Sequence, residues 1–222
     1  MIGRIAVLIL TLCLSQPVRA EVPRILVMGD SLMAINRLIG GSVAQSLAKT
    51  FGFAVVDRSV LGARYFFALP LLDLSGLKIR AQYPGGPWDY VVMNGGGNDL
   101  LFGCGCGRCA LVMNRLISSD GTRGAIPNLF AQLRATGAKV IYTGYLRTPG
   151  LISPVESCGP LGDEMDRRLT LMASRDKGVS FVPLSDLVTT EGDRSYHGFD
   201  LIHPSVKGSR AIAARIAALI TK

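Results

Sequence analysis

Short apolar runs alternate along the chain with longer stretches in which apolar residues recur at helical spacing. The apolar runs predict strands, and the helical spacing predicts amphipathic helices. We expect five strands, at residues 24–29, 53–60, 88–94, 138–145 and 179–183. We expect helices at residues 34–50, 70–82, 110–118, 124–136 and 161–177, followed by a last helix that Ser205 caps. Such alternation is typical of a parallel sheet covered on both faces, so the expected fold class is α/β.

Residues 1–20 have the layout of a secretory signal peptide. Arg4 makes the start positive, residues 5–14 form a short apolar run, and Ala20 ends a small-residue site of the kind that signal peptidases read. The apolar run is too short to span a bilayer. A short buried helix and a lipoprotein anchor are the alternatives. We therefore expect residues 21–222 to form one domain, exported to the periplasm or the cell exterior, without stable membrane insertion.

The composition limits the choice of partners. Hydrophobic residues make up 49% of the chain and charged residues 18%, which excludes a disordered chain. Removal of residues 1–20 takes away Arg4 and Arg19 and no acid, so the formal charge falls from +8 to +6. The other basic residues are scattered, without a Lys/Arg run. This favours a basic soluble protein, monomeric by default, and gives no sign of nucleic acid as a partner.

Four loops should meet at one edge of the predicted sheet. In a parallel sheet the functional groups lie on the loops that follow the carboxyl ends of the strands. The loops at that edge contain Gly29-Asp30-Ser31-Leu32, Gly62, Gly96-Gly97-Asn98-Asp99 and Asp200-Leu201-Ile202-His203-Pro204.

Three residues of these loops have the chemistry of a hydrolytic triad. Acyl transfer at neutral pH needs a nucleophile, a base that takes its proton and donors for the oxyanion. Ser31 follows a strand, where a tight turn presents its hydroxyl. His203 is one of two histidines in the chain, and Asp200 precedes it by three residues, a spacing suited to fixing its tautomer. Taken alone, Ser31 would be assigned as a helix N-cap and His203 as a surface histidine.

The predicted oxyanion donors are the backbone N–H groups of Ser31 and Gly62 and the side-chain amide of Asn98. Glycine suits a place where the backbone approaches substrate without a Cβ, and an amide is an uncharged donor. A plain turn glycine and a loop-capping asparagine are the alternatives. We expect Asp30 to position the Ser31 turn and Asp99 to brace its own loop, and we assign neither a catalytic role.

Together these blocks resemble the SGNH/GDSL hydrolases. That family has Gly-Asp-Ser after its first strand, a glycine after the second, Gly-x-Asn-Asp after the third and Asp-x-x-His before the last helix. The matching blocks here run from Ser31 to His203. The resemblance implies a flavodoxin-like three-layer α/β/α sandwich with a five-stranded parallel sheet. It also implies cofactor-free hydrolysis of small-molecule or lipid esters or thioesters through an acyl-enzyme. The family includes lysophospholipases, thioesterases, arylesterases and sugar deacetylases, and fold and triad do not choose among them.

The segment after Gly62 bears on the substrate. Tyr65 and Phe66 belong to an apolar stretch that leaves the oxyanion loop directly. Core packing is the commoner fate of such residues. The functional hypothesis is that both side chains line a groove for an apolar acyl chain, which favours acyl esters. A carbohydrate O-acetyl esterase is the alternative enzyme, and a non-catalytic module that holds an anion at Gly95–Gly97 is the alternative outside enzymes.

Four cysteines remain after removal of the signal peptide: Cys104, Cys106, Cys109 and Cys158. An even number in an exported protein predicts disulfides, and any two pairs must tie Cys158 to the 104–109 segment, which we expect to be a loop. A four-thiolate zinc or iron–sulfur site is the alternative, which the export signal disfavours. The family's general pattern does not include these cysteines.

His197, the second histidine, is expected to be an exposed loop residue. A metal site formed by His197, Asp200 and His203 is the alternative, but the spacing matches no zinc motif. We therefore expect no metal at this site.

Overall fold

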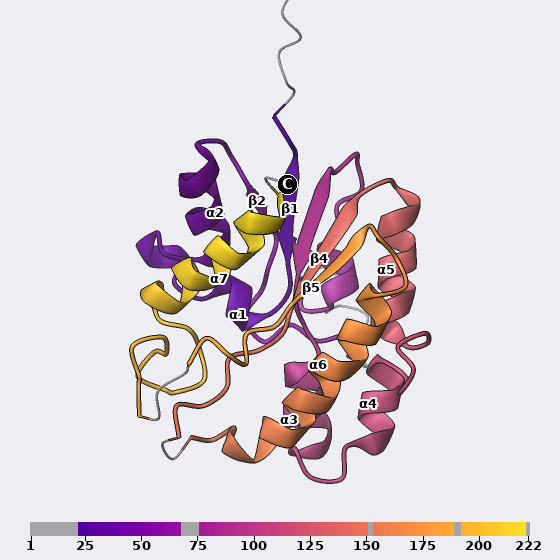
Figure 1. Cartoon of the computed structure of the whole chain (residues 1–222), viewed down its shortest axis with the longest axis vertical. Helices are drawn as coiled ribbons and strands as arrows, with labels where there is room; N and C mark the ends of the chain where they lie inside the picture. Colours follow the sequence, from indigo (N-terminus) through magenta and orange to yellow (C-terminus); the bar gives the residue numbers. More distant parts are fainter. Residues whose placement is uncertain (1–21, 68–75, 151–152, 189–191, 221–222) are drawn as a thin grey trace, which may run out of the picture.

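Five parallel strands form the centre of the molecule (Figure 1). The computed structural model describes residues 22–67, 76–150, 153–188 and 192–220. Its strands are β1 (Ile25–Met28), β2 (Val56–Asp57), β3 (Tyr90–Met93), β4 (Lys139–Thr143) and β5 (Val179–Val182). They pair in the order β2-β1-β3-β4-β5, and all neighbours are parallel. The predicted α/β fold with a five-stranded parallel sheet is confirmed. The predicted signal peptide, residues 1–20, lies outside the described residues.

Seven α-helices lie in the described part of the chain. They are α1 (Ser31–Ala34), α2 (Val43–Phe51), α3 (Gly97–Cys104), α4 (Ala110–Leu116), α5 (Ala125–Ala135), α6 (Gly159–Ala173) and α7 (Val206–Ile220). Shorter 3₁₀ helices are η1 (Arg37–Ile39), η3 (Ile79–Gln82) and η4 (Glu156–Cys158). None of the helices in these ranges is long and apolar enough to cross a membrane.

Side chains of each strand alternate between two hydrophobic layers, because successive strand residues point to opposite faces. Ile25 and Val27 pack in the layer formed with α1, α2 and α7, whereas Leu26 and Met28 pack in the layer formed with α4, α5 and α6. Figure 1 shows α2 and α7 on one side of the sheet and α5 and α6 on the other. Both faces are therefore covered, as in a three-layer sandwich, and the loops at the carboxyl edge are left to form a site.

The single helix predicted at residues 34–50 is wrong. After α1 the backbone turns through left-handed positions at Asn36 and Gly40, with φ of 65° and 73°. Ser42 then begins α2 with a capping box. Leu38, an apolar residue within the range predicted as an amphipathic helix, is fully exposed. The spacing of apolar residues carries no information about left-handed backbone positions. It therefore predicted one continuous helix where the chain forms two.

The loops predicted at residues 96–99 and 104–109 are partly helical. Gly96 adopts a φ of 93° and is the N-cap of α3, so Asn98 lies in the first turn of a helix. The helix runs as far as Cys104. Three consecutive glycines are a strong loop signal, but here only the first two act as a turn.

The helix predicted at residues 70–82 is confirmed only in its last part. Residues 70–75 lie outside the described residues, and residues 79–82 form the 3₁₀ helix η3. The predicted cap of the last helix is confirmed, because Ser205 Oγ accepts a hydrogen bond from the Gly208 N–H at 3.1 Å.

Candidate active site

Ser31 stands at the first position of α1, directly after the turn that follows β1. The Asp30 carboxylate caps this helix by accepting a hydrogen bond from the Leu32 N–H at 3.0 Å. Gly29 has a φ of 131°, and a Cβ there would lie 2.0 Å from Asn94 Oδ1, so only glycine fits. The turn therefore holds Ser31 at the carboxyl edge of the sheet, with its N–H at the amino end of a helix.

Asp30 is buried and hydrogen-bonded through both carboxylate oxygens. Asn94 Nδ2 donates to Oδ1 at 2.7 Å, and the Tyr145 hydroxyl donates to Oδ2 at 2.5 Å. Burial raises the pKa of Asp30, and the hydrogen bonds from Tyr145 and Asn94 oppose that rise. These bonds hold the Ser31 turn against the ends of β3 and β4, which agrees with the positioning role expected for Asp30.

His203 and Asp200 are in direct contact: His203 Nδ1 lies 2.6 Å from Asp200 Oδ2. Asp200 Oδ1 accepts hydrogen bonds from the backbone N–H groups of Ile202 and His203, at 3.1 and 3.0 Å. Burial works against ionisation of Asp200, but the hydrogen bonds from His203 and Ile202 hold its pKa below the usual value. An ionised Asp200 makes Nδ1 the donor, which leaves Nε2 as the basic nitrogen.

Gly62 and Asn98 come from the two neighbouring segments. Gly62 has a φ of 75°, in the left-handed region that favours glycine. Asn98 Nδ2 donates to the Ala63 carbonyl oxygen at 3.1 Å. An amide nitrogen carries two N–H groups, so Asn98 keeps one donor for a further acceptor.

Asp99 braces the segment after Gly62, rather than only its own loop as expected. Its two carboxylate oxygens accept hydrogen bonds from the N–H groups of Tyr65 and Phe66, at 3.0 and 2.9 Å. Burial raises the pKa of Asp99 to about 6, although these hydrogen bonds and the charge of Arg64 act in the opposite direction.

One cavity of about 690 Å³ brings the predicted positions together. Ser31, Gly62, Asn98, Asp200 and His203 all line it. Its other walls are largely apolar and include Leu61, Leu100, Leu101, Phe102, Leu161 and Met165. A cavity of this size and lining, with a few polar groups on one side, suits a small organic ligand.

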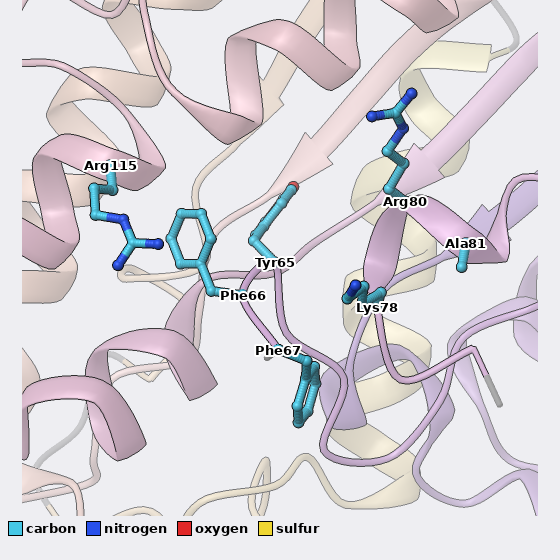
Figure 2. Close-up of a pocket in the computed structure, with 7 residues that line it drawn as sticks. All are labelled: Tyr65, Phe66, Phe67, Lys78, Arg80, Ala81 and Arg115. Atoms are coloured by element: carbon cyan, nitrogen blue, oxygen red, sulfur yellow. The ribbon is translucent and has the colours of Figure 1, made fainter. Parts of the chain in front are cut away.

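Tyr65 and Phe66, predicted to line an acyl groove, do not border the cavity that Ser31 lines. They line a second cavity of about 730 Å³, with Phe67, Lys78, Arg80, Ala81 and Arg115. Figure 2 shows Phe66 beside Arg115, whose guanidinium lies 4.2 Å from the ring centroid. The physical reason is the pair of hydrogen bonds to Asp99, which directs the backbone toward α3 and the side chains elsewhere.

The four cysteines lie in two pairs. Cys104 is paired with Cys109 and Cys106 with Cys158, with Cα atoms 5.3 and 5.0 Å apart and sulfur atoms at bonding distance. The second pair brings the segment after α3 next to the start of α6. Cys106 and Cys158 also line the Ser31 cavity.

His197 is only 6% exposed, so the prediction of an exposed loop residue was wrong. The chain folds back on itself here: His197 forms an isolated bridge with Pro204, and the Ser205 N–H donates to the Tyr196 carbonyl at 2.9 Å. Burial lowers the pKa of His197. Within the described ranges no three His, Cys, Asp or Glu side chains are arranged to hold a metal ion.

Three supporting side chains were missed by the sequence reasoning. Asn94 and Tyr145 lie at the carboxyl ends of β3 and β4, and that position was the signal available for them. Gln82 exchanges two hydrogen bonds with the Gly29 backbone, at 2.6 and 2.9 Å, across 53 positions of the chain. No local sequence pattern predicts a contact between residues so far apart in the chain.

The sequence matches the GDSL-like Lipase/Acylhydrolase family over residues 27–211. The chain therefore belongs to this family. Solved structures share its fold. A protein from Slackia heliotrinireducens assigned as an SGNH hydrolase is 22% identical, with a TM-score of 0.60 over 89% of this chain and 98% of its own.

Two esterases have the same fold. The acetyl xylan esterase AlAXEase is 16% identical, with a TM-score of 0.61 over 89% of this chain and 99% of its own. A family two carbohydrate esterase from Clostridium thermocellum, in complex with cellohexaose, is 19% identical, with a TM-score of 0.54 over 89% of this chain and 63% of its own. No curated protein matches the sequence.

Proposed function

We propose that this protein is an exported serine hydrolase of carboxylic esters or thioesters. Ser31 is the nucleophile, His203 the general base and Asp200 the partner that orients His203. The observation that carries the proposal is the 2.6 Å contact between His203 Nδ1 and Asp200 Oδ2 in the cavity that Ser31 lines. Membership of a lipase and acylhydrolase family supports hydrolysis as the reaction.

The reaction proceeds through an acyl-enzyme. Ser31 Oγ attacks the ester carbonyl carbon while His203 Nε2 takes its proton, and ionised Asp200 stabilises the imidazolium. The carbonyl oxygen becomes an oxyanion, which accepts hydrogen bonds from the N–H groups of Ser31 and Gly62 and from the second Nδ2–H of Asn98. Collapse expels the alcohol or thiol, which takes the proton from His203. Water, deprotonated in turn by His203, attacks the acyl ester and releases the acid.

The walls of the cavity support a substrate with an apolar acyl group. Leu61 and Phe102 line the cavity although 55% and 65% of their surfaces are exposed, so apolar side chains border it on the solvent side. Each methylene buried against such walls contributes about 0.8 kcal/mol to binding. Leu61 and Phe102, rather than Tyr65 and Phe66, are therefore the residues proposed to contact the acyl chain.

A carbohydrate O-acetyl esterase is the second candidate. The fold likeness to acetyl xylan esterase AlAXEase supports it. An acetyl group would place only a methyl against the apolar walls, so this candidate leaves most of the cavity lining without a role. Acetate release from acetylated xylan, together with weak hydrolysis of longer acyl esters, would favour it.

The proposal extends to the exported form of the protein. Residues 21–222 would form one domain, with Cys104–Cys109 and Cys106–Cys158 as disulfides. Non-reducing peptide mapping of protein taken from the exported fraction tests this pairing. Four free thiols, or zinc bound in their place, would overturn it.

A fluorophosphonate label tests the nucleophile. We expect the label to attach to Ser31 and to abolish hydrolysis of a p-nitrophenyl ester. Ser31→Ala and His203→Ala should each nearly abolish hydrolysis, and the double variant should be little worse, because the two residues act as one unit. Ser174→Ala, at the exposed end of α6, is the matched control.

Retained hydrolysis in Ser31→Ala would contradict the assignment of Ser31 as the nucleophile. A folded wild-type protein that is neither labelled nor active would instead support the anion-binding module.

A further inference from the structure

The Tyr145 hydroxyl bridges two segments that line the Ser31 cavity. It donates to Asp30 Oδ2 at 2.5 Å and accepts from the Gly97 N–H at 2.9 Å. Asp30 caps the helix that Ser31 begins, and Gly97 begins the helix that carries Asn98. We infer that Tyr145 is a positioning residue that fixes the separation between Ser31 and Asn98. This inference rests on the proposed function, since it assigns Tyr145 a role through those two residues.

The start of α3 depends on an acceptor from outside the helix. The first N–H groups of an α-helix have no partner within it. Gly96 occupies the N-cap position and, having no side chain, makes no side-chain cap bond. The Tyr145 hydroxyl accepts the N–H of Gly97, the first residue of α3. A residue 48 positions away thus takes the part that a capping side chain plays elsewhere.

Gly97 has the shape that this contact requires. A Cβ at Gly97 would lie 2.7 Å from Cζ of Tyr145 and 3.0 Å from its hydroxyl oxygen. Any larger residue at this position would push the ring away from the helix. The tyrosine and the glycine therefore fit each other, and the fit brings α3 close to the Ser31 turn.

Tyr145 acts in its neutral form. Burial, and then the negative charge of Asp30, raise the pKa of Tyr145 well above its usual value. The hydroxyl therefore keeps its proton, donates it to Asp30 and offers its lone pairs to Gly97. A phenylalanine would fill nearly the same space and remove both bonds at once.

Tyr145→Phe tests the inference through the balance between kcat and KM. The oxyanion exists only after attack, so a shift of Asn98 relative to Ser31 affects the transition state more than substrate binding. Small misplacements of site groups cost up to about a hundredfold in rate. We expect kcat for an aryl ester to fall about 10- to 100-fold, with KM changed by less than about threefold.

Tyr142→Phe is the matched control. Tyr142 is a buried tyrosine of the same strand region, and its hydroxyl donates to the Gly95 carbonyl at 2.7 Å and lies 3.4 Å from the Tyr65 hydroxyl, so its hydrogen bonds are to neither Asp30 nor Gly97. The Tyr142→Phe variant should be less stable than the wild-type protein but keep its kcat. An equal fall in kcat in both variants would reduce Tyr145 to a general packing residue and overturn the inference.

A double variant tests whether Tyr145 affects catalysis by positioning Asn98 or by a general effect on the structure. Asn98→Ala alone should lower kcat about 10²- to 10³-fold. If Tyr145 acts by placing Asn98, Tyr145→Phe should cost little more in the Asn98→Ala background, because coupled residues are not additive. The same fold-loss in both backgrounds overturns the inference. Failure of the proposed function is distinguishable, since the wild-type protein would then not be labelled at Ser31.

Gly97→Ala provides a second route if Tyr145→Phe does not fold. The added Cβ displaces the Tyr145 ring while leaving its hydroxyl in the protein. We expect the same pattern, a lower kcat with KM almost unchanged. Full kcat in folded Gly97→Ala contradicts the inference.

Discussion

The burial of Asp99 makes the stability of the protein depend on pH. Its pKa is raised from an ordinary value of 3.8 to about 6, with burial as the main cause. A folded-state pKa above the unfolded one means that the folded protein holds the proton more tightly. The resulting stabilisation is complete below about pH 4 and is lost as the pH rises through about 6. The difference between the two values corresponds to roughly 3 kcal/mol in the free energy of unfolding.

Asp99→Asn should remove this dependence, because asparagine resembles the protonated acid and does not titrate. In urea unfolding from pH 4 to pH 8, the variant should gain roughly 2–3 kcal/mol relative to wild type as the pH rises. Asp193→Asn is the control. Asp193 is partly exposed and its pKa is lowered, mainly by the Ser195 hydrogen bonds, so its loss acts in the opposite direction. A wild-type to Asp99→Asn difference that stays constant with pH would contradict the prediction.

The two proposed disulfides, beside α3 and α6, would close loops of very different length. Cys106 and Cys158 close 52 positions of chain, whereas Cys104 and Cys109 close 5. In the chain-entropy account, losing the disulfide that closes the longer loop lowers the free energy of unfolding by roughly 4 kcal/mol, and losing the one that closes the shorter loop lowers it by roughly 2 kcal/mol. The double variant Cys106→Ser/Cys158→Ser should therefore lose more stability than Cys104→Ser/Cys109→Ser.

Activity distinguishes the same two variants, because only Cys106 and Cys158 line the Ser31 cavity. At a temperature where both variants are folded, the loss of that pair should raise KM for a long-chain ester and leave acetyl ester hydrolysis nearly unchanged. Equal KM values in the two variants would argue that the bond stabilises the fold without shaping the cavity.

The elements that sequence reasoning predicted well are those whose pattern is local. Buried strands such as β3 and β4 are continuous apolar runs, and both were found, with ends a few residues too long. The helix boundary at residues 36–42 was missed because left-handed Asn36 leaves no trace in apolar spacing. The burial of His197 was missed because it depends on a contact with Pro204, which only the folded loop creates.

The topology of the parallel sheet explains why the sequence could place the candidate site residues at one edge. The carboxyl ends of β1, β2 and β3 share one edge in any parallel sheet, so Ser31, Gly62 and Asn98 had to approach one another. The orientation of the loop segments and side chains at that edge could not be predicted. Asp99 decides which way the segment after Gly62 faces, and Tyr145 reaches Asp30 across 115 positions of chain. Such contacts appear only once the sheet order is known.

The lining of the Ser31 cavity predicts how the rate of hydrolysis depends on acyl-chain length. Its walls come from α3 and α6, and Leu161 lines it from the first turn of α6. For p-nitrophenyl esters from acetyl to dodecanoyl, kcat/KM should rise through medium chains, since each buried methylene contributes about 0.8 kcal/mol.

Leu161→Trp should fill part of this space and remove about two methylenes from contact, which lowers kcat/KM for medium chains about tenfold and spares acetyl esters. Leu171→Trp, on the same helix but outside the cavity lining, is the matched control and should keep the wild-type series. A flat or falling series in the wild-type enzyme, with acetate released from acetylated polysaccharide, would reject the acyl cavity and favour the sugar acetyl esterase, because a methyl group gains nothing from a deep apolar wall.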